Sequence, residues 1–305
     1  MNEINSPNSI YVIVVNYKLK DDTIACLQSL LVSGCPISKI IVVDNASHDG
    51  SIETFKEKFG PELKIIEAED NRGYPHALNI GIPVALSMGA DFVLLMNNDV
   101  IVDKNYYIEL QLASKNNPKY KLFSPMILYF GAPNKIWFMG AKAIPGTMIG
   151  VRSFRGRVDS GKFPLLMDID FVHGCTMMVH KDVFEQIGQF DDEQLIYGDD
   201  ADFSWRAKLA GFKMAAVPAA KMWHKISETM GTQKPKTVYL RTRNTILFYK
   251  RYGNNFQLII MFIFTFFSSI IHILKYAFSR QFDLIPPMLN AWIDGWGGKR
   301  PVRYE

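Results

Sequence analysis

Two separate acidic elements of this chain carry side chains that could do chemistry. Asp199 and Asp200 open an acidic stretch that His224 follows, and Asn97-Asn98-Asp99 closes a strongly apolar segment earlier in the chain. A carboxylate can accept a proton as a general base, and carboxylate, amide and imidazole groups can ligate a divalent cation. Together the two elements indicate a base and a metal site.

The first half of the chain alternates buried strands with helical segments, and these elements must position the acidic side chains. Continuous β-branched runs predict parallel strands covered on both faces, and apolar residues at three- and four-residue spacing predict amphipathic helices. Strands and helices are expected, in chain order, at 10–15, 21–33, 40–43, 63–66, 76–88 and 92–96. The alternation predicts an α/β domain with a mostly parallel central sheet flanked by helices.

Polar residues stand at the carboxyl ends of four of these strands, where open α/β sheets bind their ligands. Asn16 follows the first strand, Asp44 the second, Asn71-Arg72-Gly73 the third and Asn97-Asn98-Asp99 the fourth. Turn formation alone explains any one of them, but four such ends converge on one crevice. The Gly-rich stretch 131–161 is expected to form loops over that crevice, either as a mobile lid or as ordinary surface loops.

The composition fits one large domain, or one domain with an appendage. The chain has 305 residues, of which 48% are hydrophobic and 21% charged, and its net charge of +4 is spread along the sequence. Scattered basic residues do not predict a nucleic-acid partner and suit an anionic membrane equally well. The cysteines lack CxxC spacing, which indicates neither a zinc site nor a disulfide framework. The apolar run 10–15 is too short for a signal peptide, so the catalytic part is expected in the cytosol.

A series of short motifs runs through roughly residues 10–250. It reads Ile13-Val14-Val15-Asn16-Tyr17, Val42-Val43-Asp44-Asn45-Ala46-Ser47, Asn71-Arg72-Gly73-Tyr74, Leu95-Met96-Asn97-Asn98-Asp99, Gly174-Cys175-Thr176, Gly188-Gln189-Phe190-Asp191, Gly198-Asp199-Asp200-Ala201-Asp202 and Trp223-His224. Neither GxGxxG nor GxxxxGK[ST] occurs after the first strand, which disfavours a dinucleotide-binding dehydrogenase and a P-loop NTPase. Each motif alone is weak, but the ordered series resembles the inverting family 2 glycosyltransferases of the GT-A fold.

The resemblance implies a UDP- or dTDP-sugar donor and a divalent cation, Mn²⁺ or Mg²⁺. Asn97-Asn98-Asp99 occupies the family's DxD position, with an amide in place of the first carboxylate. Asp99 and His224 are the implied metal ligands, although a His at the end of an apolar segment can also be a packed core side chain. Asp44 matches the carboxylate that accepts the imide N–H of uracil or thymine. The rest of the donor pocket would be lined by Asn16, Asn71, Arg72, Asn97 and Asn98.

By the same resemblance, Asp200 is the base of an inverting transfer. The family motif commonly reads Glu-Asp-x-Asp, and its second acid takes the proton from the acceptor hydroxyl; Asp199 here replaces the Glu. Both carboxylates stand near the start of a predicted helix, where they can also serve as caps. Asp202 and Arg206 have the spacing of a helix salt bridge. The Asp-Asp-Ala-Asp version resembles bacterial galactofuranosyl- and rhamnosyltransferases.

The end of the chain departs from a soluble enzyme, so two parts are expected: a catalytic domain at 1–250 and a membrane-associating helical region at 251–305. Residues 252–274 contain no Lys, Arg, Asp or Glu and could cross a bilayer by length. Polar residues nevertheless recur along one helical face, at Thr265, Ser268, Ser269, His272 and Lys275. A monotopic helix, or one packed on the catalytic domain, explains this stripe better than a lone span. Burial in a homo-oligomer is the remaining option.

The leading hypothesis is a metal-dependent hexosyltransferase, peripheral or monotopic on the cytoplasmic face of the membrane. It would extend a glycan or lipid-linked acceptor in bacterial-type polysaccharide or O-antigen synthesis, with dTDP-rhamnose as the first donor considered. A UDP-hexose or UDP-galactofuranose donor is the enzymatic alternative. A non-catalytic nucleotide- or sugar-binding module of the same fold is the alternative from another class. Asn97 motivates that alternative, and the intact Asp99, Asp200 and His224 argue against it.

Overall fold

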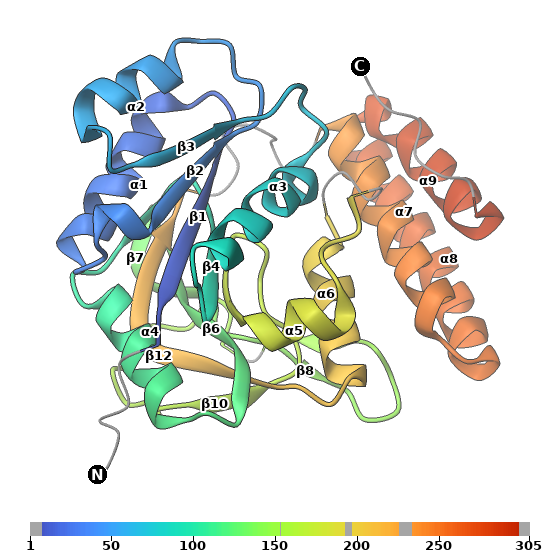
Figure 1. The fold of residues 1–305 in the computed structure, drawn as a ribbon. Coiled ribbons are helices and arrows are strands. Elements are labelled where there is room, and N and C mark those ends of the chain that lie inside the picture. Colours follow the sequence, from blue (N-terminus) through green and yellow to red (C-terminus); the bar gives the residue numbers. More distant parts are fainter. Residues whose placement is uncertain (1–7, 153, 193–196, 226–233, 299–305) are drawn as a thin grey trace.

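The computed structural model describes residues 8–152, 154–192, 197–225 and 234–298, and a central sheet flanked by helices organises most of them (Figure 1). The six predicted strands and helices of the first half are confirmed, with boundaries shifted by no more than two residues, and the structure adds a helix at 51–59 that was not predicted. The elements of this half are β1 (Ile10–Asn16), α1 (Lys20–Val32), β2 (Ile40–Asp44), α2 (Ser51–Phe59), β3 (Lys64–Glu67), α3 (Tyr74–Ser87) and β4 (Phe92–Asn97).

The sheet is parallel in its first half and mixed beyond it. β1 pairs in parallel with both β2 and β4, and β3 joins β2 in parallel. β11 (Thr176–His180) then lies antiparallel between β4 and β6 (Tyr120–Tyr129), and β12 (Lys213–His224) pairs in parallel with β6. β10 (Met167–Ile169) closes that edge, antiparallel to β12. The antiparallel strands are an addition that the alternation in the first half did not predict.

Both faces of β1 are buried, as its β-branched sequence predicts. Successive side chains of a strand point to opposite faces, so Val12 packs in the core cluster shared with α1 and α4 (Tyr106–Asn116), and Ile13 packs in the cluster shared with α3. Gly81 lets α3 lie close to the sheet, because a Cβ there would stand 3.0 Å from the side chains of Ile13 and Val43. The sheet that carries the polar strand ends is therefore covered on both sides.

The stretch 131–161 is more ordered than the expected loops, which corrects that expectation. It contains β7 (Ala132–Phe138), which pairs antiparallel with β6, and a short hairpin of β8 (Lys142–Ala143) and β9 (Gly150–Val151). A Cβ at Gly150 would stand 3.1 Å from the ring of Phe171, so β9 lies tightly against that side chain. Backbone pairing thus positions much of this stretch.

Three helices pack together at one side of the α/β part: α7 (Pro235–Tyr252), α8 (Asn255–Phe278) and α9 (Ile285–Gly297), coloured orange to red in Figure 1. A capping box between Asn254 and Gln257 starts α8. Gly295 lets α9 approach α7, because a Cβ there would stand 2.9 Å from Cβ of Ile246. The predicted boundary between a catalytic domain and a membrane-associating region, after residue 250, falls in the last turn of α7 and stays a prediction.

α8 is packed with part of its polar stripe inward and with apolar side chains outward. Thr265 and Ser269 are buried, and Nε1 of Trp296 donates to Oγ1 of Thr265 at 3.3 Å. The helix is long and apolar enough to cross a membrane, with 24 residues and a mean hydropathy of 2.1 over its most apolar window, of which only 17% is buried. We define the apolar face of α8 as its apolar side chains that are more than half exposed: Phe256, Ile259, Ile263, Phe264, Phe267, Ile271, Leu274 and Phe278.

Gly295→Ala is expected to destabilise the packing of α9 on α7. The added Cβ would stand 2.9 Å from Ile246, and overpacking of this kind costs about 1–3 kcal/mol. Gly297→Ala is the matched control, because nothing lies within 4 Å of a Cβ added there. In urea denaturation, the free energy of unfolding of Gly295→Ala should be lower than that of Gly297→Ala by about that amount. Equal values for the two variants would contradict the close helix packing.

Candidate active site

Strand pairing brings Asp99 and His224 together. Asp99 precedes the short strand β5 (Val100–Val102), and His224 is the last residue of β12, which pairs antiparallel with β5 so that His224 faces Val100. Oδ1 of Asp99 lies 3.2 Å from Nε2 of His224, and both side chains are buried. The two residues predicted as metal ligands are therefore neighbours, although they are far apart in the sequence.

The chemistry of this pair fits a divalent cation. Oδ1 of Asp99 and Nε2 of His224 face each other at 3.2 Å without the geometry of a hydrogen bond. Among the described residues, no other partner satisfies these two buried atoms or Nδ1 of His224. Buried polar atoms are rarely left so, because desolvation is costly, and a cation that accepts oxygen and imidazole ligands would satisfy them. No third His, Cys, Asp or Glu completes a group with them among the described residues. A bound cation would therefore need further ligands, such as phosphate oxygens or water.

Asp99 is held in its charged form by its surroundings. Burial raises the pKa of Asp99, but the neighbouring His224 and Asn97 outweigh burial and hold the pKa below its ordinary value. Asn97 is the last residue of β4 and stands where the DxD pattern has its first carboxylate. The amide of Asn97 thus lies beside the carboxylate of Asp99 and adds no second negative charge.

Asp200 lies in the first turn of α6 (Asp199–Leu209) with its carboxylate fixed by two backbone donors. Gly174 N–H donates to Oδ2 at 2.9 Å, and Ala201 N–H donates to Oδ1 at 2.8 Å. A carboxylate oxygen can accept more than one hydrogen bond. Asp200 is therefore oriented and still able to accept from a substrate.

A cavity of about 210 Å³ opens beside Asp200, between the sheet region and α7. His173 lines it, and Nδ1 of this ring accepts from Cys175 N–H at 3.1 Å, so the neutral ring carries its proton on Nε2. Burial lowers the pKa of His173, which keeps the ring neutral near pH 7. Other lining residues are Phe138, Ala141, Met148, Arg152, Phe171, Asn244, Thr245, Phe248 and Tyr249.

The other two acidic residues of α6 have different surroundings. Asp199 is buried, and this burial, with the adjacent charge of Asp200, raises its pKa. Asp202 is only 1% exposed and accepts from Nε of Arg206 at 2.8 Å, which confirms the expected helix salt bridge. Asp202 also accepts from Nη1 of Arg251 at 2.9 Å and from the hydroxyl of Tyr252 at 2.7 Å. It therefore fastens α6 to the end of α7.

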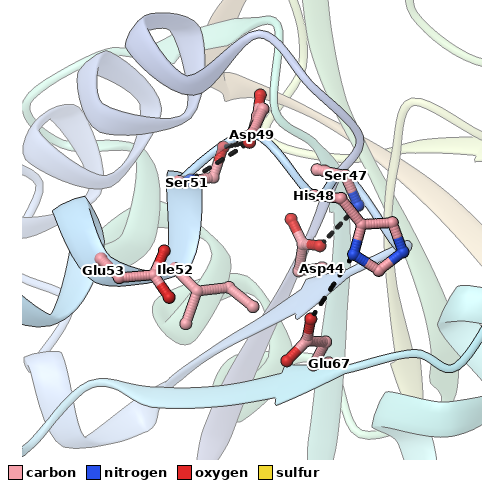
Figure 2. A pocket seen from close by; sticks show the side chains of 9 residues that line it. Asp44, Ser47, His48, Asp49, Ser51, Ile52, Glu53 and Glu67 are labelled. Carbon is pink, nitrogen blue, oxygen red and sulfur yellow. Dashed lines mark hydrogen bonds and ion pairs between the residues drawn. The ribbon is translucent and has the colours of Figure 1, made fainter.

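Asp44 ends β2 and lines a second cavity, of about 220 Å³, where Figure 2 shows it beside Ser47. Ser47 N–H donates to Oδ1 of Asp44 at 2.8 Å, and the amide of Asn16 donates to Oδ2. The amide of Asn98 donates to Oγ1 of Thr23 at 2.9 Å and to Oδ1 of Asn16 at 3.3 Å. The predicted residues Asn16, Asp44 and Asn98 thus belong to one buried hydrogen-bond network.

The remaining predicted residues lie at the turn before α3. Oδ1 of Asn71 accepts from the amide of Asn45 at 2.9 Å and from Gly73 N–H at 3.1 Å. Arg72 lies in the same turn and is partly exposed. Asn71 is therefore connected to the end of β2 and shapes the turn, as the alternative of simple turn formation also predicted.

Residues that the sequence did not single out complete the Asp200 cavity. Trp137 packs at a tilt between two imidazoles, with ring centroids 4.5 Å from His173 and 4.9 Å from His224, so it connects the lining of the cavity to the Asp99–His224 pair. The amide of Asn244 donates to the carbonyl of Tyr197 at 2.8 Å and ties α7 to the turn before α6. The only local signal was His173, which directly precedes Gly174; Arg152 and Asn244 come from a hairpin and a helix that no motif marks.

Comparison with known sequences gives a consistent set of relatives. The profile of Glycosyltransferase like family 2 matches residues 7–245. The low-salt glycan biosynthesis hexosyltransferase Agl10 of Haloferax volcanii is 24% identical over 79% of this chain and 75% of its own. The N-acetylglucosaminyl-diphospho-decaprenol L-rhamnosyltransferase of Mycobacterium tuberculosis is 22% identical over 70% of this chain and 74% of its own.

Solved structures share the architecture. GalNAc-T7 with UDP, GalNAc and Mn²⁺ has a TM-score of 0.62 at 16% identity, covering 80% of this chain and 50% of that one. The mannosyltransferase PcManGT of Pyrobaculum calidifontis, in complex with GDP-Man and Mn²⁺, has a TM-score of 0.57 at 13% identity, covering 97% of this chain and 90% of that one. At such identities the likeness shows the fold, and the predicted GT-A fold is confirmed.

Asp199→Asn is expected to stabilise the protein more at high pH than at low pH. Folding raises the pKa of Asp199 above the value near 3.9 of an unfolded Asp. As the pH rises from about 4, the unfolded chain releases a proton that the folded chain keeps, so stability is lost. Asn cannot titrate. The gain in unfolding free energy over the wild type should therefore grow by about 1 kcal/mol or more between pH 4 and pH 8 in urea titrations.

The same titrations on Asp283→Asn, which changes an exposed carboxylate, provide the comparison. A gain for Asp199→Asn that does not change with pH would contradict the raised pKa.

Proposed function

We propose, from the premise that the chain belongs to the family 2 glycosyltransferases, that it transfers a hexose from a nucleoside diphosphate sugar to a hydroxyl of a glycan or lipid-linked acceptor. The observation that carries the proposal is the juxtaposition of two features. Asp200 is an oriented carboxylate in a cavity. Across Trp137 from that cavity, Asp99 and His224 form a buried pair whose facing atoms and second ring nitrogen make no hydrogen bond within the described part of the chain. This is the arrangement that a base and a cation-assisted leaving group require.

Asp200 is the proposed base of an inverting transfer. Its carboxylate would accept the proton of the acceptor hydroxyl while that oxygen forms a bond to the anomeric carbon. The bond between this carbon and the donor phosphate oxygen breaks, and the nucleoside diphosphate leaves with the bonding electrons. Gly174 and Ala201 orient the carboxylate. Asp199, whose pKa is raised by burial and by Asp200, can stay neutral beside a charged base.

Asp99 and His224 are the proposed ligands of Mn²⁺ or Mg²⁺, which when bound would neutralise charge on the leaving diphosphate. The orphaned ring nitrogens and carboxylate oxygen support this assignment. Mn²⁺ in the solved structures of GalNAc-T7 and PcManGT also supports it. Asn97 lies beside Asp99, where its amide can contribute an oxygen toward the donor.

The donor nucleoside is proposed to lie along the strand ends between Asp44 and Asp99. β1 separates β2 from β4, and neighbouring strands are about 4.8 Å apart, so the two strand ends lie about 10 Å from each other. That span suits a nucleoside with its base near Asp44 and its diphosphate near Asp99. Asp44 would accept the imide N–H of uracil or thymine, with Asn16 and Asn98 fixing its position. Asn71 and Arg72 would border the base.

dTDP-rhamnose is the first donor to test, supported by the rhamnosyltransferase of Mycobacterium tuberculosis among the relatives. A UDP-hexose or UDP-galactofuranose is the second, because the relative from Haloferax volcanii is a hexosyltransferase and uracil presents the same imide edge as thymine. A polysaccharide or O-antigen intermediate is the proposed acceptor. A non-catalytic nucleotide- or sugar-binding module remains an outcome of the test.

Residues 251–305 are proposed to hold the protein on the cytoplasmic face of a membrane. The apolar face of α8 supports this, since it presents a continuous set of exposed Phe, Ile and Leu side chains. Exposed Lys275 and Arg280 stand at the end of the helix, where they can meet anionic headgroups. The buried Thr265 and Ser269 favour a helix that lies in the interface over one that crosses it.

Asp200→Asn is expected to reduce transfer about 10²–10⁴-fold, because it removes the general base, and to leave donor binding intact. The assay is release of nucleoside diphosphate from a panel of UDP- and dTDP-sugars with a lipid-linked acceptor extract, with Mn²⁺ or with EDTA. Asp103→Asn, a carboxylate that lines neither cavity, is the control. Substantial turnover by Asp200→Asn would remove it from the base role, and transfer unaffected by EDTA would exclude the cation. Nucleotide binding without turnover of any donor would favour the binding module.

The double variant Ile263→Glu with Phe267→Glu is expected to lose membrane binding. Each wild-type side chain would contribute about 1.5–3 kcal/mol by burial in lipid, so co-sedimentation with phosphatidylglycerol vesicles should fall at least tenfold. Leu209→Glu is the control, because Leu209 is 65% exposed and lies on α6, outside the apolar face of α8. Unchanged sedimentation, combined with a shift from dimer to monomer in light scattering, would identify the face as a homo-oligomer contact instead.

A further inference from the structure

We propose that Arg152, with Arg155 and Arg241 beside it, forms an anion subsite that binds a phosphate group of the acceptor next to Asp200. The inference rests on the proposed function, because it names the chemical class of the acceptor: a hexosyl acceptor linked to a lipid through phosphate. It concerns the Asp200 cavity and not the strand ends at Asp44 and Asp99.

The cavity has two unlike walls. Phe138, Phe171 and the hairpin β8–β9 form one wall, and α7 forms the other with Asn244, Thr245 and Phe248. Asp200 and His173 are its proton-accepting and hydrogen-bonding groups, and Arg152 is the only Lys or Arg in its described lining. The cavity therefore combines apolar faces, a carboxylate and one cation, a composition suited to a sugar that carries an anionic substituent.

Arg152 is fixed at the mouth of this cavity. It directly follows β9, whose Gly150 lies tightly against Phe171, and its guanidinium carbon stands 5.6 Å from the ring centre of Phe138. Desolvation lowers the pKa of Arg152, and the attraction of Asp200 opposes this effect. Among the described residues no ion pair joins Arg152 to a carboxylate. Arg152 is exposed, so its guanidinium is open to a ligand, and the planar fork of this group matches phosphate oxygens.

Two further arginines add positive charge to this mouth. Arg155 and Arg241 both act on Arg152, and their repulsion lowers its pKa further. Arg241 lies one turn before Thr245 on α7, on the helix face that lines the cavity. Such a cluster of like charges is unfavourable without a counter-ion, and a phosphate would relieve it.

The position of Arg241 favours the acceptor as the source of the phosphate. Its charge also acts on Tyr276 in the last turns of α8, so Arg241 stands between the cavity and the helix that carries the apolar face. A lipid-linked acceptor could place its sugar at Asp200, its phosphate at the arginines and its chain toward α8. A diphosphate of the donor, in contrast, is expected at Asp99 and His224.

Binding of three probes to the full-length protein tests the proposal: geranylgeranyl diphosphate in detergent, inorganic pyrophosphate, and UDP with Mn²⁺. Arg152→Gln and Arg241→Gln are each expected to weaken geranylgeranyl diphosphate about tenfold or more, since each removes a charged hydrogen-bond donor. Pyrophosphate, which lacks the chain, should bind the wild type more weakly than the lipid and lose affinity in the same variants. UDP affinity should not change.

The control is Arg157→Gln, a basic residue of the same stretch that stands over Phe154 and lines neither cavity. Thermal melting verifies folding, and the exposed Arg241 gives a second variant with little risk to the fold. An equal loss of UDP affinity would assign the arginines to the donor and overturn the proposal, as would unchanged lipid binding in both variants. These measurements report binding and need no turnover, so they can be interpreted even if the protein shows no transferase activity. Failure of the anion-subsite proposal would not affect the assignment of Asp200 as the base.

Discussion

The Asp99–His224 pair depends on one contact, the pairing of the short strand β5 with the end of β12. It places His224 opposite Val100, next to Asp99, and Lys225 N–H donates to the carbonyl of Asp99 at 3.0 Å. On its other edge β12 pairs with β6, where His224 faces Tyr129. Since a strand register that slips by one residue turns every side chain to the opposite face, pairing on both edges protects the alignment of Asp99 with His224.

The predictable part of the fold is the parallel half of the sheet, where local sequence patterns mark each strand. β-branched runs and helical spacing predicted β1 to β4 with α1 and α3, although not α2, and the polar ends at Asn16, Asp44 and Asp99 do converge. The second half could not be read in this way. β11 joins the sheet antiparallel between β4 and β6, and β12 shifts register between Val217 and Lys221. Such pairings depend on partners distant in sequence, which local patterns do not encode.

The candidate site follows the same division. Asp200 and His224 were identifiable because the ordered motif series resembles a known family. Arg152 and Asn244 were not, because a two-residue strand and a long helix have no distinguishing local pattern. Asn244 matters through its bond to the carbonyl of Tyr197, which joins α7 to the turn that begins α6. Asp202 of α6 makes a second connection between the two helices, through Arg251 and Tyr252 at the other end of α7. The helix therefore belongs both to the Asp200 cavity and to the C-terminal bundle, which a division of the sequence by hydropathy could not show.

The place of Trp137 between two imidazoles limits how this enzyme could evolve. The indole packs against His173 on the side of the Asp200 cavity and against His224 on the side of Asp99. A smaller residue at 137 would leave space behind His173, which lines the Asp200 cavity, but it would also remove the ring that packs against His224. Under the proposed function, more room for the acceptor at this position is thus coupled to a loss of support for His224, the proposed metal ligand. Under the proposed function, changes of acceptor specificity have freer routes at Met148 and Thr245, which line the cavity that neither Asp99 nor His224 lines.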